Sequence, residues 1–596
     1  MKRVIQLLLA FSASACVDVA HAADMNKVLR VAFPVDVTGF DPQELNDVFS
    51  MYIFQTILEP LYAYYYLTRP YKLVPNTAEA LPEVADGGKR LVIRVKKGIY
   101  FTADPAFNGK RRELTADDYV YSWKRLLDPK VRSPNYSMLE SKLVGGDEAV
   151  EAAKKSGKFD YNTPIPGLKA IDRYTIQIQL IKPNYTLIDN LAHAATGAVA
   201  REVIEKYGDG SNWAISNPVG TGPYMLKDWR KGSKVVIEAN PDYRDSRFPE
   251  GSDPADKTVA AQMKGKKLPA IGRIEISIIE ESNPRFLAFQ SKQTDLLYVP
   301  TDFVNRVVDN GRLKPEFADQ KINWTRAVEA GWTYTVLNMD DPAIGGFSKE
   351  KIALRRAIGL GYNITDEIGV LRQGQGTPAT QPIPPNLPGY DPNLKRPYPY
   401  DPAAANALLD KFGYKDCNGD GYRELPDCQP LVLRYHTTPS EISRQFSELW
   451  KKSMDAIGIR IEFTLQKWPD MMKAAKAGKV MMFGLGGTAS VRDGEQFLNQ
   501  LYSKYIDYSN FSRFRMESYD RLFEQSQTLP DGPERNKAYR MLSDHFVTYA
   551  PVLFATNRIN NSLVYPWVQG WKMNSFSPYP FLYLDIDAAR QKAALK

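Results

Sequence analysis

One stretch of the sequence places acidic and amide side chains at the spacing of a calcium-binding loop. Asp416, Asn418, Asp420 and Asp427 occupy positions 1, 3, 5 and 12 of a DxNxDG template. Oxygen ligands of this kind are the ones that Ca²⁺ prefers in proteins. A tight turn that uses Asn, Asp and Gly for its backbone demands has the same composition. The sequence therefore leaves two interpretations of this loop, a calcium site and a metal-free turn.

Two cysteines lie in and beside the same loop. Cys417 and Cys428 are the cysteines that an exported chain would keep after loss of its N-terminal segment. An oxidising compartment favours a disulfide between two such cysteines. We therefore predict a Cys417–Cys428 bond, which could shape the loop without metal.

No other pattern of reactive residues matches a catalytic template. The histidines outside the N-terminal segment are His193, His436 and His545, and none stands in a metal-ligand spacing such as HExxH. The sequence also lacks a GxSxG nucleophile elbow. We predict that the chain is not an enzyme and uses no cofactor, with calcium as the one candidate.

A glycine pair, Gly220 and Gly222, raises the question of a phosphate-binding loop. Pro223 follows the second glycine and removes a backbone N–H donor. Residues 234–239 then continue as an apolar strand, whereas a phosphate loop opens a helix. Residues 217–224 are therefore predicted to form a turn between strands.

The N-terminus has the pattern of a secretory signal. Lys2 and Arg3 precede an apolar run, and residues 20–22 supply a small-x-small cleavage site, so residues 1–22 are expected to be removed. Lipid attachment at Cys16 is the alternative. No later stretch approaches the roughly 18 consecutive apolar residues of a transmembrane helix. We expect an exported chain.

The elements that position these residues are mixed along the whole chain. Short alternating strands are predicted at residues 28–35, 90–98, 174–181, 271–279 and 332–339. Helices are predicted at residues 115–127, 353–363, 401–413 and 443–458, with Thr115 and Asp401 as caps. This order indicates an α/β chain. The 77 Lys and Arg residues are interspersed among 69 Asp and Glu, which argues against a nucleic-acid partner.

Several segments together resemble a known family. They are GFDPQ (39–43), ILEPLY (57–62), NPVGTGPYMLKDW (217–229), RFLAFQSKQTDLLYVP (285–300), YDPAAANALLDKFGYKD (400–416) and VQGWKM (568–573). In this order they resemble the extracytoplasmic solute-binding proteins of family 5. That class includes the oligopeptide- and dipeptide-binding proteins of ABC transporters, and the resemblance covers essentially the whole mature chain.

The resemblance implies a large type II periplasmic-binding-protein fold. This is an α/β fold of two lobes with a hinge and an extra domain inserted in lobe 1. The implied boundaries are 23–66, 214–332 and 553–596 for lobe 1, 67–213 for the inserted domain, and 333–552 for lobe 2.

The resemblance also implies a function and partners. We expect a periplasmic monomer that captures a peptide-like or other small organic solute by hinge closure and delivers it to an inner-membrane ABC permease. A peptide-holding chaperone or sensor module with the same cleft is the alternative, and an exported hydrolase is a third, disfavoured one.

One cleft segment departs from the pattern of peptide-binding members. Their W-x-A-D-Y-x-D-P segment uses its first aspartate to bind the peptide's α-ammonium group. Anchoring on residues 497–498 places Gly487 at the tryptophan, Ser490 at that aspartate and Asp493 at the later one. Losing one member of a buried ion pair typically costs about 3–5 kcal/mol. Free-amine peptides are therefore disfavoured, unless Asp493 or another carboxylate has taken over the role.

The same segment offers other ligand groups. Arg492 and the glycine-rich residues 484–488, which end at Thr488, would suit an anionic or neutral solute. The resemblance further implies ligand contacts for Tyr121 and Asn510, and a place near the crossing region for Phe40 and Asp41. Trp468, which follows a predicted strand, is a further candidate for the cleft wall.

Overall fold

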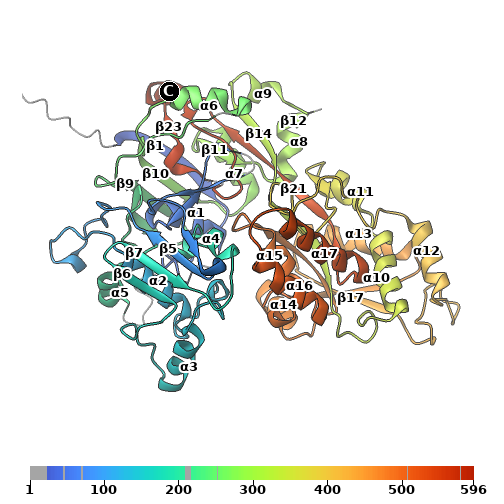
Figure 1. Cartoon of the computed structure of the whole chain (residues 1–596). Helices are drawn as coiled ribbons and strands as arrows, with labels where there is room; N and C mark the ends of the chain where they lie inside the picture. The colour runs from blue at the N-terminus through green and yellow to red at the C-terminus, as the bar shows by residue number, and fades with distance from the viewer. Residues whose placement is uncertain are drawn as a thin grey trace, which may run out of the picture.

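The structure, a computed structural model, describes residues 23–44, 47–68, 71–208, 216–251, 253–309, 311–506, 508–577 and 579–596. These residues form two bodies joined by strands that pass between them (Figure 1). One body holds the blue and green elements, and the other holds the yellow and orange ones. The predicted α/β class is confirmed. The predicted signal peptide and Cys16 lie outside the described residues.

Lobe 1 is built on two sheets. The first sheet has the order β1 (Asp24–Phe33), β10 (Ile271–Ile278), β9 (Lys234–Ala239) and β8 (Tyr224–Arg230), with β1 and β10 parallel. In the second, the long strand β21 (Thr556–Val564) pairs with β11 (Leu296–Tyr298) and β14 (Asn323–Val328). At the hinge, the first residues of β21 also pair with β16 (Gly376–Pro378), which comes from the lobe 2 part of the chain. Leu29, Val31 and Phe33 alternate along β1 and are fully buried, so one face of this strand forms the core.

The inserted domain has its own sheet and core. Its strands, in sheet order, are β4 (Glu83–Ala85), β5 (Arg90–Arg94), β7 (Thr175–Gln179) and β6 (Leu168–Asp172). Its main helices are α2 (Ala116–Leu127) and α3 (Gly146–Ser156). Tyr119 and Trp123 of α2 are buried in its core.

Lobe 2 is a five-stranded sheet with helices on both faces. The strand order is β18 (Arg460–Leu465), β17 (Val432–Thr437), β19 (Met482–Thr488), β15 (Gly331–Leu337) and β20 (Val552–Phe554). One face packs against α14 (Trp468–Lys476), α16 (Glu517–Gln527) and α17 (Pro533–Tyr549). The other packs against α10 (Lys349–Gly361), α12 (Pro402–Lys411) and α13 (Glu441–Asp455).

The remaining elements are short, and most lie in lobe 1 or between the lobes. They are α1 (Val48–Ile57), β2 (Tyr62–Tyr64), β3 (Leu73–Pro75), α4 (Thr186–Asn190), α5 (Arg201–Tyr207), α6 (Lys257–Met263), α7 (Ser282–Gln290), α8 (Val304–Val307), β12 (Val308–Asp309), β13 (Arg312–Leu313), α9 (Pro315–Ala318), α11 (Ile364–Asp366), α15 (Glu495–Leu498), β22 (Val568–Gln569), β23 (Asp585–Ile586) and α18 (Ala588–Ala594).

The chain changes from one lobe to the other at two places. β14 ends at Val328 in a lobe 1 sheet, and β15 begins at Gly331 in the lobe 2 sheet. The return occurs between β20 of lobe 2 and β21 of lobe 1, at Ala555. The backbone N–H of Glu329 donates to the carbonyl of Arg558 at 2.9 Å, so the two crossing segments are bonded to each other. They form the hinge region described below.

The glycine pair Gly220 and Gly222 has a structural role. An added Cβ would lie 1.8 Å from the carbonyl oxygen of Ile57 at Gly220 and 2.3 Å from that of Thr56 at Gly222. Both glycines are therefore needed because the turn before β8 packs directly on the backbone at the end of α1. The predicted turn is confirmed, and it is followed by strand β8 (Tyr224–Arg230), whereas a phosphate loop opens a helix.

The predicted helix caps also form. The side chain of Asp401 accepts a hydrogen bond from the backbone of Ala404, with Pro402 as the first residue of α12. At the start of α2, the backbone N–H and hydroxyl of Thr115 donate to Asp118 at 2.7 and 2.9 Å. Local side-chain chemistry thus sets both helix starts.

Candidate functional site

A cavity of about 370 Å³ lies where lobe 1 meets the hinge region. Lobe 1 contributes α1, the end of β1, β11, residues 573–575 and Tyr579, and lobe 2 contributes the end of β19. We call this the hinge cavity. Its lining residues with polar side chains are Tyr52, Arg285, Tyr298, Thr301, Glu329, Thr488, Arg558, Asn560, Asn574, Ser575 and Tyr579.

A second cavity, of about 270 Å³, lies in lobe 2 along β15, β17 and β19. We call it the lobe 2 cavity. Aromatic side chains form much of its wall, and Trp450 stacks on Tyr362 with ring centroids 4.2 Å apart. Its aromatic lining residues are Tyr334, Tyr362, Tyr435, Phe446, Trp450 and Trp468. Such walls favour flat apolar groups.

Arg558 lines both cavities. Its Nε donates to Glu329 Oε2 at 2.7 Å and its Nη2 to Glu329 Oε1 at 3.2 Å, which makes a two-pronged ion pair. The hydroxyl of Thr488 also donates to Glu329 Oε1, at 2.5 Å. These three side chains tie both crossing segments to the end of β19. A solute touching Arg558 would therefore contact the element about which the lobes move.

Three tyrosines, Tyr52, Tyr298 and Tyr579, line the lobe 1 side of the hinge cavity. Burial raises the pKa of Tyr52 well above its ordinary value, and the nearby carboxylate of Glu329 adds to the effect. Burial raises the pKa of Tyr579 in the same direction. Both phenols thus stay protonated over the physiological range, where a phenol O–H donates as well as accepts hydrogen bonds.

Two of the sequence-predicted ligand residues line these cavities. Thr488 lies in the hinge cavity, and Trp468 lies in the lobe 2 cavity with 49% of its surface exposed. Gly487 is paired with Trp332 in the sheet between them. Ser490 follows in the next loop, and its backbone N–H and hydroxyl bond the side chain of Gln496 at 3.0 and 3.3 Å. The ligand contacts of Gly487 and Ser490 stay predictions.

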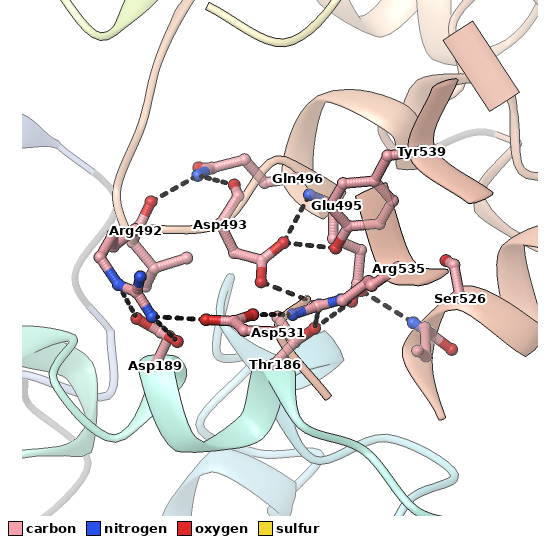
Figure 2. Close-up of polar contacts among 12 residues, drawn as sticks. Thr186, Asp189, Arg492, Asp493, Glu495, Gln496, Ser526, Asp531, Arg535 and Tyr539 are labelled. Carbon is pink, nitrogen blue, oxygen red and sulfur yellow. Dashed lines mark hydrogen bonds and ion pairs between the residues drawn. The ribbon is translucent and has the colours of Figure 1, made fainter. Parts of the chain in front are cut away.

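Arg492 and Asp493 belong to a polar cluster between the lobes (Figure 2). Arg492 pairs with Asp189 of α4 in the inserted domain at 3.2 Å and with Asp531 of lobe 2 at 3.0 Å. Asp493 is 1% exposed and lies 2.8 Å from Nη2 of Arg535. These contacts occupy Arg492 and Asp493 with protein partners and join the inserted domain to lobe 2.

The interlobe cluster contains more acids than bases. Its carboxylates are Asp189, Asp493, Glu495 and Asp531, and its guanidiniums are Arg492 and Arg535. Burial raises the pKa of Asp189 to about 7, although Arg492 opposes the rise. Burial also raises the pKa of Asp493, against the effect of Arg535. Burial thus favours the protonated form of Asp189 near neutral pH.

Four further predicted residues lie outside the two cavities. Phe40 is buried against Trp229. Asp41 pairs with Arg125 at 2.6 Å in a buried contact. Tyr121 packs beside Tyr161 in the inserted domain, and Asn510 is fully buried in lobe 2 with its amide bonded to the carbonyls of Tyr502 and Phe514. Ligand contacts for these four residues remain predictions.

The predicted disulfide is present between Cys417 and Cys428, whose Cα atoms are 5.9 Å apart. In the loop that it closes, both carboxylate oxygens of Asp416 accept backbone N–H groups, at 2.6 and 2.9 Å. The backbone N–H of Gly421 thereby lowers the pKa of Asp416. Asp420 pairs with Arg460 at 2.7 Å.

A calcium ion would compete with these partners for the same oxygens. In the described residues, no group of three or more His, Cys, Asp or Glu side chains is arranged to hold a metal ion. The calcium interpretation of this loop, with Asn418 and Asp427 as further ligands, remains a prediction.

Sequence reasoning missed Glu329 and Arg558. They are 229 positions apart, and only the pairing of β14 with β21 brings them together. Neither residue stands in a motif. The one available signal was the position of Glu329 beside the predicted boundary between lobe 1 and lobe 2.

Comparison with known proteins agrees with this geometry. The profile of the bacterial extracellular solute-binding proteins, family 5 (middle region), matches residues 72–509. Heme-binding protein A of Haemophilus influenzae is 25% identical over 86% of this chain and 84% of its own length. Di/tripeptide-binding protein 2 of Pseudomonas aeruginosa is 26% identical over 98% of both chains. The periplasmic binding protein DppA of Helicobacter pylori, solved with peptide STSA, superposes with a TM-score of 0.71 at 21% identity, covering 94% and 99%.

The fold and the cleft define a two-lobed solute-binding protein. The chain belongs to the bacterial extracellular solute-binding proteins of family 5, with the type II periplasmic-binding-protein fold. Its role is substrate binding for an ABC importer, with a small solute and an inner-membrane permease as partners. Its family and relatives are binding proteins. No helix among the described residues is long and apolar enough to cross a membrane.

Proposed function

We propose that this chain captures one small organic solute, peptide-like or of another class, between its lobes and releases it to the permease without chemical change. The observation that carries the proposal is the pair of cavities that meet at Arg558 on the hinge. One cavity is mainly walled by lobe 1 and the other by lobe 2. A solute that spans them gains its full set of contacts only when the lobes are together.

Hinge closure supplies the mechanism. A ligand shifts an equilibrium between open and closed states only by the extra contacts that it makes in the closed state. Here those contacts are the tyrosines of lobe 1 on one side and the aromatic wall of lobe 2 on the other. The Arg558–Glu329 pair lies between them and is bonded to both crossing segments.

The reactive groups near the cleft support binding without catalysis. Burial lowers the pKa of His193 to about 4, and this residue lies in the inserted domain, outside both cavities. His436 lines the lobe 2 cavity, where its Nδ1 is bonded to Gln466 at 2.9 Å. Among the described residues, neither histidine is hydrogen-bonded to a serine or cysteine side chain.

Export completes the proposal. We propose that residues 1–22 act as a signal that is cleaved after Ala22, which releases the mature chain into the periplasm. The charged start, apolar run and small-residue cleavage site support this step. Lipid attachment at Cys16 is the alternative, and it would appear as extra mass at the mature N-terminus.

Mass spectrometry of protein taken gently from the periplasm tests these points together. Under native conditions we expect excess mass that disappears on denaturation, because a captured solute is held without a covalent bond. The denatured mass should equal that of a chain starting at residue 23. A solute chemically altered by incubation with the pure protein would show turnover and contradict the binding role.

A further inference from the structure

Both carboxylates that line the cleft cavities are already occupied by protein groups. Glu329 accepts hydrogen bonds from Arg558 and Thr488. Glu367, in the lobe 2 cavity, accepts from Arg372 at 2.7 Å, from Thr556 at 2.6 Å and from Tyr362 at 2.8 Å. A ligand ammonium group therefore meets no free carboxylate among the described residues that line the two cavities.

The guanidinium groups of the cleft have fewer protein partners than its carboxylates. Within the described part of the chain, Nη1 of Arg558 donates no hydrogen bond, and 38% of this side chain is exposed. Arg285 lines the hinge cavity and donates to the carbonyls of Ile279 and Glu280, without a carboxylate within ion-pair distance among the described residues. Its pKa is lowered by burial, which indicates that its charge is incompletely compensated.

The charge balance of the cleft is therefore positive. The guanidiniums that line it or pair with its acids are Arg285, Arg372 and Arg558, and the carboxylates are Glu329 and Glu367. The guanidinium without a carboxylate partner among the described residues is that of Arg285, which lines the hinge cavity together with Arg558. A buried charge is stabilised when a ligand brings the opposite one, and a planar guanidinium matches a carboxylate best.

Glycines leave space at the unpaired edge of Arg558. Gly486 lines the lobe 2 cavity, and a Cβ added to it would lie 3.8 Å from Nη1 of Arg558. A Cβ on Gly484 would lie 2.6 Å from the hydroxyl of Tyr435, so a side chain there would have to displace the cavity wall. Gly486 thus leaves room beside the guanidinium of Arg558, and Gly484 leaves room for the hydroxyl of Tyr435.

We propose that the solute of this protein is an organic acid with a flat apolar or aromatic body and no requirement for a free ammonium group. Its carboxylate binds Arg558 at the hinge, and its body packs against Trp468 and the neighbouring aromatic side chains of lobe 2. The inference deepens the proposed function and rests on it. It makes Arg558 the residue that selects for the acid.

Three matched probes test this assignment by calorimetry. N-acetyl-phenylalanyl-phenylalanine carries a carboxylate and no ammonium group. Its C-terminal amide carries neither charge, and phenylalanyl-phenylalanine amide carries only the ammonium group. We expect the acid to bind at least about tenfold more tightly than the amide, because a charge-assisted hydrogen bond is lost. The ammonium probe should be the weakest.

Variants of Arg558 distinguish loss of its charge from loss of the folded structure. R558Q should weaken the acid at least about tenfold and leave the neutral amide unchanged, whereas R558K should retain part of the preference. R444Q is the matched control, because Arg444 is exposed on α13 in lobe 2 and its ion-pair partners among the described residues, Glu441 and Glu448, belong to its own helix. Thermal unfolding of R558Q checks that the variant is folded.

The outcomes distinguish this inference from the proposed function. The inference is overturned if the ammonium probe binds more tightly than the acid, or if R558Q weakens the acid and the amide equally. If none of the probes binds, the chemical class of the solute found by native mass spectrometry tests the inference instead. An acidic solute supports the inference, and a solute without an acidic group overturns it while leaving the proposed function intact. Absence of both probe binding and a captured solute would refute the proposed function itself.

Discussion

Replacing Arg535 by methionine should strongly destabilise the contact between lobe 2 and the inserted domain. Arg535 is 2% exposed and reaches Asp493 at 2.8 Å, Asp531 at 2.7 Å and Thr186 at 2.7 Å (Figure 2). Removing one partner of a buried ion pair typically costs about 3–5 kcal/mol, since the other charge stays buried. Asp493 keeps two donors, the hydroxyl of Tyr539 and the backbone of Glu495. We therefore expect a loss of about 3 kcal/mol, the lower end of that range.

The loss should depend on pH in a defined direction. Burial raises the pKa of Asp493 in the folded protein, and loss of Arg535 should raise it further. A carboxyl group with a raised folded pKa destabilises the fold when ionised, which is the case above that pKa. The penalty shrinks as pH falls towards the unfolded value near 4. R535M should therefore lose less stability at pH 5 than at pH 8.

Urea unfolding followed by circular dichroism at both pH values measures these quantities. D493N and the double variant R535M/D493N complete a double-mutant cycle, and we expect a coupling of at least about 1 kcal/mol. R521M is the control, because Arg521 is exposed on α16 and its ion-pair partner in the described part of the chain is Glu517 of the same helix. A loss below about 1 kcal/mol for R535M, or an equal loss at both pH values, would refute the reasoning.

Three further predictions follow from the same structure. Burial raises the pKa of Asp189 to about 7, so the contribution of this residue to stability falls as pH rises from 5 to 7, by up to about 1.4 kcal/mol per pH unit. The urea midpoint of D189N should lack this pH dependence. An unchanged pH dependence would argue against a raised pKa of Asp189 in this cluster. The variant C417S/C428S should lose about 2–3 kcal/mol of unfolding free energy from opening its short loop, and no loss would mean that the bond is dispensable. EDTA should leave the melting temperature unchanged, because the oxygens of Asp416 and Asp420 already have partners; a fall that calcium reverses would instead establish the calcium site.

The sequence predicted more of the fold than of the candidate site. The ordered family segments predicted two lobes and the inserted domain, and local signals at Thr115 and Asp401 predicted where two helices begin. The glycine pair at 220 and 222 was correctly assigned to a turn, because Pro223 removes a donor that a phosphate loop needs. These features depend on residues that are neighbours in the chain.

The site depends on contacts that the sequence does not display. Arg492 was a candidate ligand for an anion, but its partner Asp189 lies 303 positions away in the inserted domain. The Arg558–Glu329 pair likewise forms only because two distant strands meet at the hinge. Spacing along the chain carries no information about such pairs, since a long-range ion pair is created by tertiary packing. The sequence predicted Arg492 as a ligand of an anionic or neutral solute, and that prediction stands beside the proposal for Arg558.

Small-angle X-ray scattering tests the central claim, reversible capture of a solute between the lobes, most directly. Protein stripped of its solute in urea and refolded would be compared with the same protein after the released solute is added back. We predict that the radius of gyration is larger for the stripped protein and returns to the original value on addition, because the solute favours the closed lobes. Equal scattering from stripped and loaded protein would contradict capture by lobe closure.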